Sequence, residues 1–560
     1  MRRISIAVVA LVMALLLAAP ASADLARQVQ PFEGEAPKLT IGFSNQPDYD
    51  ADSTRWPTEL FKYIREYMNV DLTFTNLGDS QQLQIALAGG DLPDVVMLQK
   101  DYLTQVLDAG LIVPMDDYLS YAPNLVGLSK LREAAMREYC SNGDGKWYFW
   151  TPQIGVESPD AYLWNGYTVR WDYYAELGYP KIASEDDYIA FMKAAVAAHP
   201  QTASGQKVWG YATYNDLWGW WVPGSFYGYH NITDEYHLRS KDSALINAYL
   251  DFEGPIWKQV AFCYKLNQEG LFDPDSFTMT SEDMNAKVAN EQYVAIICQW
   301  YDKLYDIKRM EDPDTLSGYV TLPVEGQGNW SGANVRAGWS FYYGITTNCA
   351  DPIIPMRMYD FFNSEEGARI LLTGEQGRIW DYDANGTPVI TQEAINNKAT
   401  MAADEWIKWG GGVWGGIPGI GQHTVLSDGG KANLWKDRQM MAASLRPLDV
   451  DFCKHYGVEL PYEAAYRLIA EGKAYDKSNC MWDLVGLLGT PPTEISRIDN
   501  NCREIITRAL PELVLAADQA AYDAKQQAVI DELNAAGIQE SNDWWQAAAA
   551  PIAAFVEANS

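Results

Sequence analysis

Residues 82–98 read QLQIALAGGDLPDVVML, and this stretch indicates the fold class of the chain. Its first half has the pattern of an amphipathic helix that stops at Gly89 and Gly90. A glycine such as Gly89 tolerates the left-handed conformation that closes a helix, and Pro93 prevents the helix from continuing. The short run that begins at Val95 is rich in β-branched residues, as expected of a buried strand. These features predict a helix-to-strand junction in a parallel sheet.

The segments before this junction alternate between strand and helix patterns. Residues 38–43 and 70–75 predict strands, and Pro57 followed by apolar residues on one helical face predicts a helix between them. Together with the junction they make a βαβαβ unit, the building block of an open, mostly parallel sheet. Ligands of such sheets bind beyond the carboxyl ends of the strands. The polar residues expected there are Asn45, Gln46 and Gln81.

A second set of elements follows an aromatic, strand-like run at residues 145–151. Ser184 and the three acidic residues after it predict a helix cap. Arg170 and Asp172 predict an ion pair between a strand end and a helix start. The other predicted elements are an extended crossing at 161–169, a helix from Asp172, buried strands at 294–297 and 338–346, and a capped helix at 363–372.

The first 23 residues have the three parts of an export signal. Arg2 and Arg3 form the basic region, residues 4–19 form the apolar core, and residues 21–23 form a small-residue cleavage site. The apolar core is shorter than the roughly 20 residues that a membrane span needs. No cysteine follows the cleavage site. The mature chain is therefore expected to be exported, periplasmic or extracellular, without a lipid anchor.

Length and charge exclude several classes of protein. The 560 residues exceed what one hydrophobic core organises, so two or three domains are expected. Removing Arg2 and Arg3 shifts the formal net charge from −32 to −34. Such an acidic surface repels nucleic acids and anionic membranes, which bind through basic patches. We therefore expect no nucleic-acid partner.

The seven cysteines are odd in number and have no metal-ligand spacing. Cys480 and Cys502 are the pair to test first for a disulfide. The alternative, in which all seven are buried free thiols, is equally open.

Several segments, in this order, resemble the extracellular solute-binding proteins of ABC importers, in particular the large family-1 group that includes the alginate-binding proteins. The resemblance covers nearly the whole mature chain, and the shared order of the segments is more specific than any single one. The matching segments are ALAGGDLPDVV at 86–96, GLIVPMDDYL at 110–119, GKWYFWTP at 145–152, TVRWDYYAELGYP at 168–180, QEGLFDP at 268–274, GWSFYYGITTN at 338–348, YDFFNSEEGARILLTGEQG at 359–377 and KQQAVIDELNAAGI at 525–538.

The resemblance implies an α/β, two-lobed periplasmic-binding-protein-like fold of type II, with discontinuous lobes joined by a hinge. The N-terminal lobe would comprise 38–155 and 335–400, and the C-terminal lobe 160–334 and 401–560. It also implies a monomer that captures a carbohydrate, most simply an oligosaccharide or another hydroxylated solute, and delivers it to the permease subunits of an ABC transporter. Neither a cofactor nor a metal is expected.

The aromatic content fits a carbohydrate ligand. The chain has 21 Trp and 34 Tyr, and flat aromatic rings pack against the C–H faces of sugars. For any one tryptophan, packing in the core is the alternative to ligand binding. Trp220 and Trp221 lie in a segment broken by Gly and Pro, which predicts a loop. The remaining aromatic candidates are Trp300 and Tyr301 after a predicted strand, where the alginate-binding proteins carry a stacking tryptophan, Trp414 in a glycine-rich loop, and Trp164 on the extended crossing.

Three motifs are better explained without a metal or a nucleotide. Asp381 opens a calcium-like loop, but Gln392 stands where a bidentate Glu belongs, so an Asn-Gly hairpin is the simpler interpretation. Residues 199–207, which match the calcium loop of the alginate-binding proteins, have no carboxylate. The GxGxxG spacing at 410–415 follows a helical pattern, whereas a dinucleotide site follows a strand.

An enzyme is the alternative class. A secreted glycoside hydrolase needs a pair of carboxylates, and 74 acidic residues leave room for one. No carboxylate lies in a catalytic signature, the five histidines have no metal-ligand spacing, and no GxSxG elbow is present. A binding protein without catalytic activity is therefore the preferred interpretation.

Overall fold

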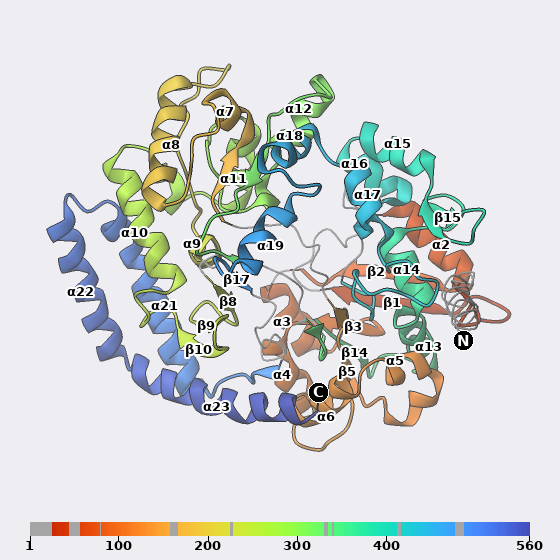
Figure 1. Cartoon of the computed structure of the whole chain (residues 1–560). Helices are drawn as coiled ribbons and strands as arrows, with labels where there is room; N and C mark the ends of the chain where they lie inside the picture. Colours follow the sequence, from red (N-terminus) through yellow and green to blue (C-terminus); the bar gives the residue numbers. More distant parts are fainter. Residues whose placement is uncertain are drawn as a thin grey trace, which may run out of the picture. The chain divides into compact units, whose positions relative to one another are not determined.

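The computed structural model describes residues 25–43, 57–78, 80–156, 166–224, 228–329, 334–338, 341–411, 416–476 and 487–559 (Figure 1). The chain forms two compact units, and each contains two separate parts of the sequence. Unit 1 comprises Met1–Gly155 and Ala337–Met440, and unit 2 comprises Val156–Arg336 and Met441–Ser560. The third passage between the units runs through helix α17 (Arg438–Ala443).

Unit 1 is built around the predicted βαβαβ unit. Strand β1 (Lys38–Phe43) lies between β2 (Asp71–Asn76) and β3 (Val95–Leu98), and both pairings are parallel. The crossover helices are α2 (Thr58–Met68) and α3 (Ser80–Gly89). The predicted apolar face of α2 is buried. All four residues of β3 are buried as well, so the apolar, β-branched run at this position correctly predicted a buried strand.

The junction between α3 and β3 differs from the prediction by one residue. Gly89 is the last helical residue, and Gly90 has the left-handed conformation, with φ +68°. The Asn348 side chain donates hydrogen bonds to the carbonyls of Gly90 and Leu92, at 2.8 and 2.9 Å. The Thr346 hydroxyl donates to the carbonyl of Pro93 at 2.6 Å. A segment far along the chain therefore holds this turn closed.

That segment extends β14 (Tyr342–Thr346), which the chain forms after it returns to unit 1. Strand β14 inserts between β3 and β4 (Ile112–Val113) and runs antiparallel to both. Strand β5 (Phe149–Trp150), from the predicted aromatic run, also pairs with β14. The strand order β2-β1-β3-β14-β4 therefore joins both parts of unit 1 in one mixed sheet.

The other elements of unit 1 surround this sheet. Ser364 caps α14 by accepting a hydrogen bond from the backbone of Gly367, as predicted. The other elements of unit 1 are η2 (Lys100–Tyr102), α4 (Leu103–Asp108), η3 (Asp116–Tyr121), α5 (Pro123–Leu128), α6 (Lys130–Tyr139), α13 (Ile353–Phe362), α14 (Glu365–Thr373), β15 (Trp380–Tyr382), β16 (Pro388–Ile390), α15 (Gln392–Thr400), α16 (Ala403–Trp406), the π-helical turn η7 (Ile407–Gly411) and η8 (Leu434–Lys436).

Residues 401–440 belong to unit 1, whereas the sequence analysis assigned them to the C-terminal lobe. The π-helical turn η7 packs on α2, and Gly410 lies 3.5 Å from the backbone of Leu60, measured from its ideal Cβ position. Leu434 and Trp435 join a core cluster with Ile379 and Trp380. These contacts link residues distant in sequence, and no local pattern marks them.

Residues 25–37 form a strap across unit 1. The backbone N–H of Val29 donates to the buried Glu366 carboxylate at 2.8 Å, and that of Phe32 donates to the Met68 carbonyl at 2.9 Å. At the start of the strap, Leu25 donates to the Tyr382 hydroxyl at 2.7 Å. This hydroxyl donates in turn to Asp428, whose other oxygen pairs with the fully buried Arg369. The first residue of the strap is therefore linked, through the Tyr382 hydroxyl, to a buried ion pair.

Unit 2 has smaller sheets and more helix. Strands β7 (Thr168–Arg170) and β11 (Tyr319–Thr321) pair antiparallel, and three further strands form an antiparallel sheet in the order β10-β9-β8. The predicted cap and ion pair are confirmed. Ser184 accepts from the backbone of Asp187, and Arg170 lies 2.9 Å from Asp172.

The other elements of unit 2 are α7 (Trp171–Glu176), α8 (Glu185–Ala198), α9 (Leu217–Gly224), β8 (Tyr229–Asn231), β9 (Tyr236–Arg239), β10 (Ala244–Asn247), α10 (Pro255–Gln268), η5 (Pro274–Phe277), α11 (Ser281–Ala289), η6 (Gln299–Tyr301), α12 (Leu304–Glu311), α18 (Pro447–Tyr456), α19 (Tyr462–Ala470), α21 (Thr493–Val514), α22 (Gln519–Ala536) and α23 (Ile538–Ala558). Four further strands have two residues each. They are β6 (Gly155–Val156), which spans the boundary between the units, and β12 (Gly328–Asn329), β13 (Asn334–Val335) and β17 (Tyr475–Asp476).

One predicted strand of unit 2 is wrong. Residues 294–297 are buried as expected, but they do not form a strand. They lie beside isolated bridges, one from Tyr293 to Trp209 and one from Ala295 to Val169. An apolar run of four residues is buried in either arrangement, so hydrophobicity alone does not separate them.

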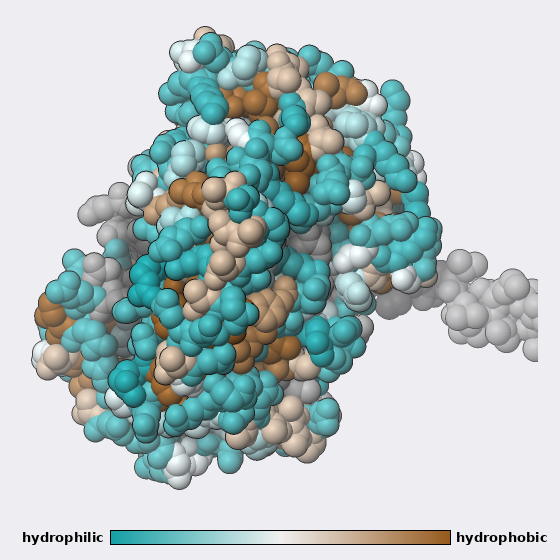
Figure 2. All heavy atoms as spheres, turned by 90° about the vertical axis from the view of Figure 1, so that its left-hand side faces the viewer, coloured by the Kyte–Doolittle hydropathy of each residue, from teal (hydrophilic) through white to brown (hydrophobic). Residues whose placement is uncertain are grey.

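One face of unit 2 is mostly hydrophilic. Figure 2 shows the face that carries α22, where hydrophilic residues cover most of the surface and apolar residues occur in small groups. Across the described ranges, no helix combines the length and apolarity that crossing a membrane would require.

Six of the seven cysteines are described, and no two of these six form a disulfide with each other. Cys502 is buried in α21. Cys480 lies outside the described residues, so the pairing of Cys480 with Cys502 stays a prediction.

Two of the three motifs set aside on sequence grounds are the Asn-Gly hairpin and the GxGxxG spacing, and both have simple structures. Strands β15 and β16 form an antiparallel hairpin, and the Asp383 carboxylate accepts from the backbone N–H groups of Asn385 and Thr387, both at 2.9 Å. Gly386 has φ +77°, as an Asn-Gly turn requires. Helix α16 and the first residues of η7 precede Gly410, so a helical segment leads into the GxGxxG spacing, as predicted.

Candidate functional site

The main candidate site is a cluster of aromatic rings in unit 2. The indoles of Trp218 and Trp300 stack with centroids 5.6 Å apart and planes 19° apart. The side chain of Trp300 is 60% exposed, and Trp218 is half-buried. We call this pair the tryptophan platform. It presents a flat apolar surface to solvent, which is the geometry that packs against the C–H face of a sugar.

Two short helices place the platform. Trp218 lies in the first turn of α9, where the Asp216 carboxylate accepts a hydrogen bond from the Trp218 backbone N–H at 2.8 Å. Trp300 is the middle residue of η6, a turn of only three residues. Backbone hydrogen bonds from Tyr301 to Cys298 and from Asp302 to Gln299 close that turn.

Two tyrosines support the platform from below. The ring of Tyr301 is 8% exposed and lies 6.2 Å from Trp218, and Tyr214 lies 6.0 Å from Tyr301. Burial raises the pKa of both phenols above the usual value. Both therefore stay neutral at physiological pH and serve as packing groups.

Trp220 and Trp221 are in a helix, and the predicted loop is wrong. They lie in α9 and are 1% and 4% exposed. Trp220 stacks on Phe277 at 5.8 Å, and the Trp221 indole N–H donates to Asp234 at 2.9 Å. Gly219 and Pro223 occur inside this helix without breaking it, because the segment is short and packs on α10. Both side chains belong to the core of unit 2.

The remaining predicted site residues fall into three groups. Tyr301 packs beneath the platform, as described above. Gln81 is exposed in the first turn of α3, at the end of the sheet where the carboxyl ends of β1, β2 and β3 meet. Four others lie outside the described residues, namely Asn45, Gln46, Trp164 and Trp414.

Sequence reasoning missed Trp218 as a site residue. Trp218 belongs to the same aromatic segment as Trp220 and Trp221, and composition does not distinguish the three. A three-residue periodicity pairs Trp218 with Trp221, and their rings meet edge to face at 5.9 Å. Its contact with Trp300 depends on the tertiary fold.

Two carboxylates beside the platform, those of Asp216 and Asp302, accept hydrogen bonds from the protein. Asp216 binds the backbone of Trp218, and Asp302 binds the backbone N–H groups of Tyr305 and Tyr319 and the guanidinium of Arg446. Asp302 is nearly buried, and burial raises its pKa, while the Arg446 charge acts in the opposite direction. These carboxylates therefore have structural partners.

Among the described residues, no group of three or more His, Cys, Asp or Glu side chains is arranged to hold a metal ion. The loop at residues 199–207 satisfies its own polar groups. Thr202 and Gln206 exchange backbone and side-chain hydrogen bonds, and Gln201 forms a bridge to Lys207. The Lys207 ammonium lies 3.1 Å from the ring centre of Trp209, so a cation–π contact fixes the end of this loop.

No protein-family profile and no curated protein sequence matches the chain. The fold, in contrast, is similar to many solved structures. The alginate-binding protein AlgQ2 without calcium aligns with a TM-score of 0.61 and 14% identity over 94% of this chain and 100% of that one. The Streptococcus pneumoniae ABC-transporter substrate-binding protein FusA, in complex with kestose, aligns with a TM-score of 0.59 and 15% identity over 92% and 99% of the two chains.

A third structure, an ABC-transporter-associated solute-binding protein from Bifidobacterium longum infantis that binds human milk oligosaccharides, has a TM-score of 0.56 and 12% identity. It covers 92% of this chain and 99% of its own. At such identities the comparison concerns the fold. The predicted type II solute-binding fold is confirmed, and the sequence resemblance agrees with it.

Proposed function

We propose that this protein is the substrate-capturing receptor of an ABC transport system for a carbohydrate, and that it has no catalytic activity. The observation that carries the proposal is the tryptophan platform, a stacked and exposed indole pair supported by two buried tyrosines. Single exposed apolar side chains, such as Phe252 and Met310 of the same unit, need no function, whereas two stacked indoles form a larger flat apolar surface, which favours a binding role. The similar solved structures include receptors of oligosaccharides, which supports the same ligand class.

In this proposal units 1 and 2 correspond to the two lobes, and the ligand is captured between them by closure about the crossings. Closure is stabilised only by contacts that the ligand makes in the closed form. The platform supplies the apolar contact from unit 2, and Gln81, Asn45 and Gln46 supply polar contacts from unit 1. The receptor acts as an exported monomer and delivers its ligand to membrane permease subunits.

A glycoside hydrolase is the competing function. It requires one carboxylate to act as a general acid and a second to act as a base or a nucleophile. The carboxylates nearest the platform instead accept backbone and guanidinium hydrogen bonds, which support a structural role. Incubation of the protein with each oligosaccharide that it binds, followed by product chromatography, tests this. Release of smaller sugars in proportion to protein concentration would overturn the receptor function.

A thermal-shift screen against malto-, fructo-, xylo- and alginate oligosaccharides tests the proposal directly. A ligand present at 100 times its dissociation constant stabilises the folded state by roughly 2.7 kcal/mol. Trp300→Ala is expected to remove most of this shift because it deletes the exposed half of the platform. Val425→Ala, which truncates an exposed apolar residue of unit 1, is the control and should retain the shift. An unchanged shift in the Trp300 variant would return Trp300 to a packing role.

Closure is tested separately by small-angle X-ray scattering. A panel sugar that produces a thermal shift is expected to reduce the radius of gyration. A bound ligand with no compaction would remove the hinge mechanism and leave the binding role intact.

A further inference from the structure

The turn that carries Trp300 has little structure of its own. Helix η6 has three residues and is closed by two backbone hydrogen bonds, which do not fix a turn by themselves. Its position therefore depends on the residues at its two ends, Cys298 and Asp302. Cys298 is fully buried, and Asp302 is held by polar contacts.

Asp302 connects the turn to three other segments. One oxygen accepts from the backbone N–H of Tyr319 in β11 at 3.1 Å and from Arg446 Nη1 at 2.9 Å. The other accepts from the backbone N–H of Tyr305 at 3.3 Å, at the start of α12. The Asp302 side chain is only 5% exposed. A carboxylate this buried is costly without a cationic partner, and Arg446 supplies that partner.

Arg446 is itself held in place by a second carboxylate. Its Nε and Nη2 donate to the two oxygens of Asp449, at 2.8 and 3.0 Å. Its backbone N–H donates to the same carboxylate at 3.2 Å. Asp449 lies in the first turn of α18, so the start of that helix fixes the guanidinium. The remaining nitrogen, Nη1, is directed at Asp302. The guanidinium also lies 5.1 Å from the ring centre of Tyr305.

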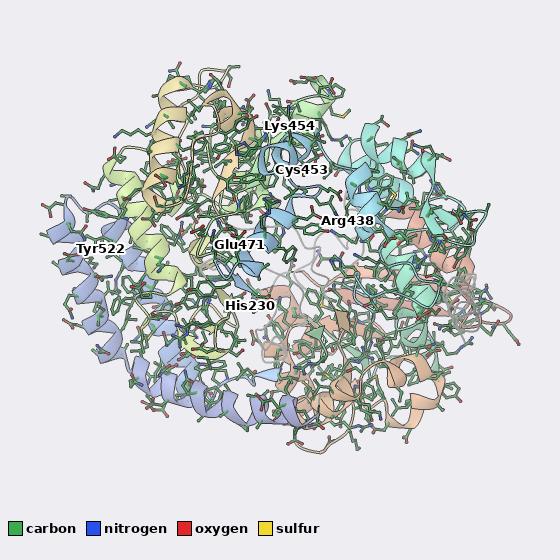
Figure 3. The ribbon with its side chains drawn as sticks, viewed as in Figure 1. His230, Arg438, Cys453, Lys454, Glu471 and Tyr522 are labelled. Carbon is green, nitrogen blue, oxygen red and sulfur yellow. The ribbon has the colours of Figure 1, made fainter. Side chains whose placement is uncertain are left out.

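These contacts join two distant parts of the chain. Arg446 follows the third passage into unit 2, whereas Trp218 and Trp300 belong to the earlier part of that unit. Figure 3 marks α18 by Cys453 and Lys454, and Figure 1 shows α12 and α18 side by side. The close approach of Gly318 to Leu448, Tyr305 and Asp302 agrees with this arrangement.

We propose that Arg446 is a positioning residue for ligand binding, because it clamps Asp302 and thereby holds the Trp300 indole stacked on Trp218. This inference rests on the proposed role of the tryptophan platform. The Arg446 guanidinium bonds to Asp302 and Asp449, and its effect on binding is transmitted through Asp302 and the turn that precedes it. Loss of the clamp frees one end of the turn, and the Trp300 ring then occupies several orientations of which only some present a flat surface with Trp218.

The first experiment is a double-mutant cycle on ligand affinity, measured with the panel oligosaccharide that gives the largest thermal shift. Arg446→Met is expected to weaken binding by about tenfold, as is typical when the support of a binding residue is lost. In the Trp300→Ala background the same substitution is expected to have no further effect. Equal losses in both backgrounds would show that Arg446 acts independently of Trp300 and would overturn the proposal.

Arg239→Met is the matched control. Arg239 makes the same bidentate pair with a carboxylate three residues ahead, at 3.0 and 2.7 Å to Asp242, in the same unit. Among the described residues, Asp242 is the one carboxylate that the Arg239 guanidinium pairs with, so no bond corresponds to that from Arg446 to Asp302. The ligand affinity of Arg239→Met is expected to stay within about twofold of that of the original protein. Arg446→Lys, which retains a charge near Asp302, should recover part of the affinity.

The second experiment needs no sugar. Acrylamide quenching of tryptophan fluorescence is measured for each protein and for its Trp300→Phe counterpart, and the difference isolates Trp300. Arg446→Met is expected to increase the quenching of Trp300, and Arg239→Met to leave it unchanged. Should Arg446→Met fold poorly, it is combined with Asp302→Asn and Asp449→Asn, so that neither buried carboxylate is left without its cation, and this variant is measured instead.

The two experiments separate two kinds of failure. If no oligosaccharide binds, or if Trp300→Ala leaves affinity unchanged, the proposed function of the platform fails while quenching still reports on the clamp. If sugar binds through Trp300 and Arg446→Met alters neither quenching nor affinity, the clamp proposal fails and the function stands.

Discussion

The junction at residues 82–98 and the turn at η6 both place residues of a predicted site, yet they are built in opposite ways. At the junction a helix, a glycine turn and a four-residue strand each follow from neighbours in sequence. At η6 three residues are held by Asp302, Arg446 and the rings beneath them, most of which come from other parts of the chain. Local patterning therefore specifies the scaffold, whereas tertiary contacts specify the candidate binding surface.

The largest expected effect tests whether the aromatic segment of α9 belongs to the core. Trp220→Ala removes a fully buried indole and leaves a cavity beside Phe277. We expect a loss of about 3–5 kcal/mol in the free energy of unfolding, measured by urea denaturation. A loss below about 1 kcal/mol would mean that Trp220 lies in a loop, as its Gly and Pro neighbours alone predicted.

A second test asks whether a buried carboxyl group destabilises unit 1 at neutral pH. Asp360 is nearly buried in α13 of unit 1, and burial raises its pKa from 3.8 to about 6. Because the folded state holds this proton more tightly than the unfolded state, stability falls as pH rises from about 4 to 6. Asp360→Asn does not titrate, and its amide oxygen still accepts from the backbone of Asn124.

We therefore expect Asp360→Asn to stabilise the protein by about 2 kcal/mol above pH 7 and by progressively less toward pH 4. Urea denaturation of both proteins across this range measures the difference. A difference that does not change with pH would contradict the raised pKa. Asp381→Asn, at an exposed position in the same unit, is the control.

A third test concerns the turn at the junction. Asn348→Ala deletes the side chain that donates to the carbonyls of Gly90 and Leu92. We expect destabilisation by about 1 kcal/mol, the usual net contribution of such hydrogen bonds. Native-state hydrogen exchange should place the added opening in α3 and β3. If protection there is unchanged, the local sequence alone closes the turn.

The smallest expected effect on stability belongs to the platform. Trp300→Ala removes an indole that is mostly exposed, so unfolding in the absence of sugar should change by less than about 0.5 kcal/mol. Thermal denaturation without ligand measures this. The contrast with Trp220→Ala separates a surface that is retained for binding from one that is retained for packing. A loss comparable to that of Trp220→Ala would assign Trp300 to the core.

The sequence was sufficient for the first βαβαβ unit because each element there has an apolar periodicity with clear ends. Helix α2 buries the predicted face, and β1 has the predicted bounds. The sequence was insufficient for α9, whose residues LWGWWVPG are apolar on every side and carry no polar residue that would indicate which face is buried. Trp300 was predicted from its place after a buried run, although that run forms isolated bridges.

The strap at residues 25–37 has a practical consequence for any binding assay. The Leu25 backbone N–H donates a hydrogen bond to the Tyr382 hydroxyl, and this hydroxyl donates to Asp428 of the buried ion pair with Arg369. An affinity tag fused directly ahead of Leu25 would begin beside the hydrogen bonds that hold the strap, from Leu25 to Tyr382 and from Val29 to Glu366. The last turn of α23, whose final residues are exposed, offers an attachment point that leaves those contacts intact. Sensor surfaces that carry this protein are therefore best loaded through its last helix.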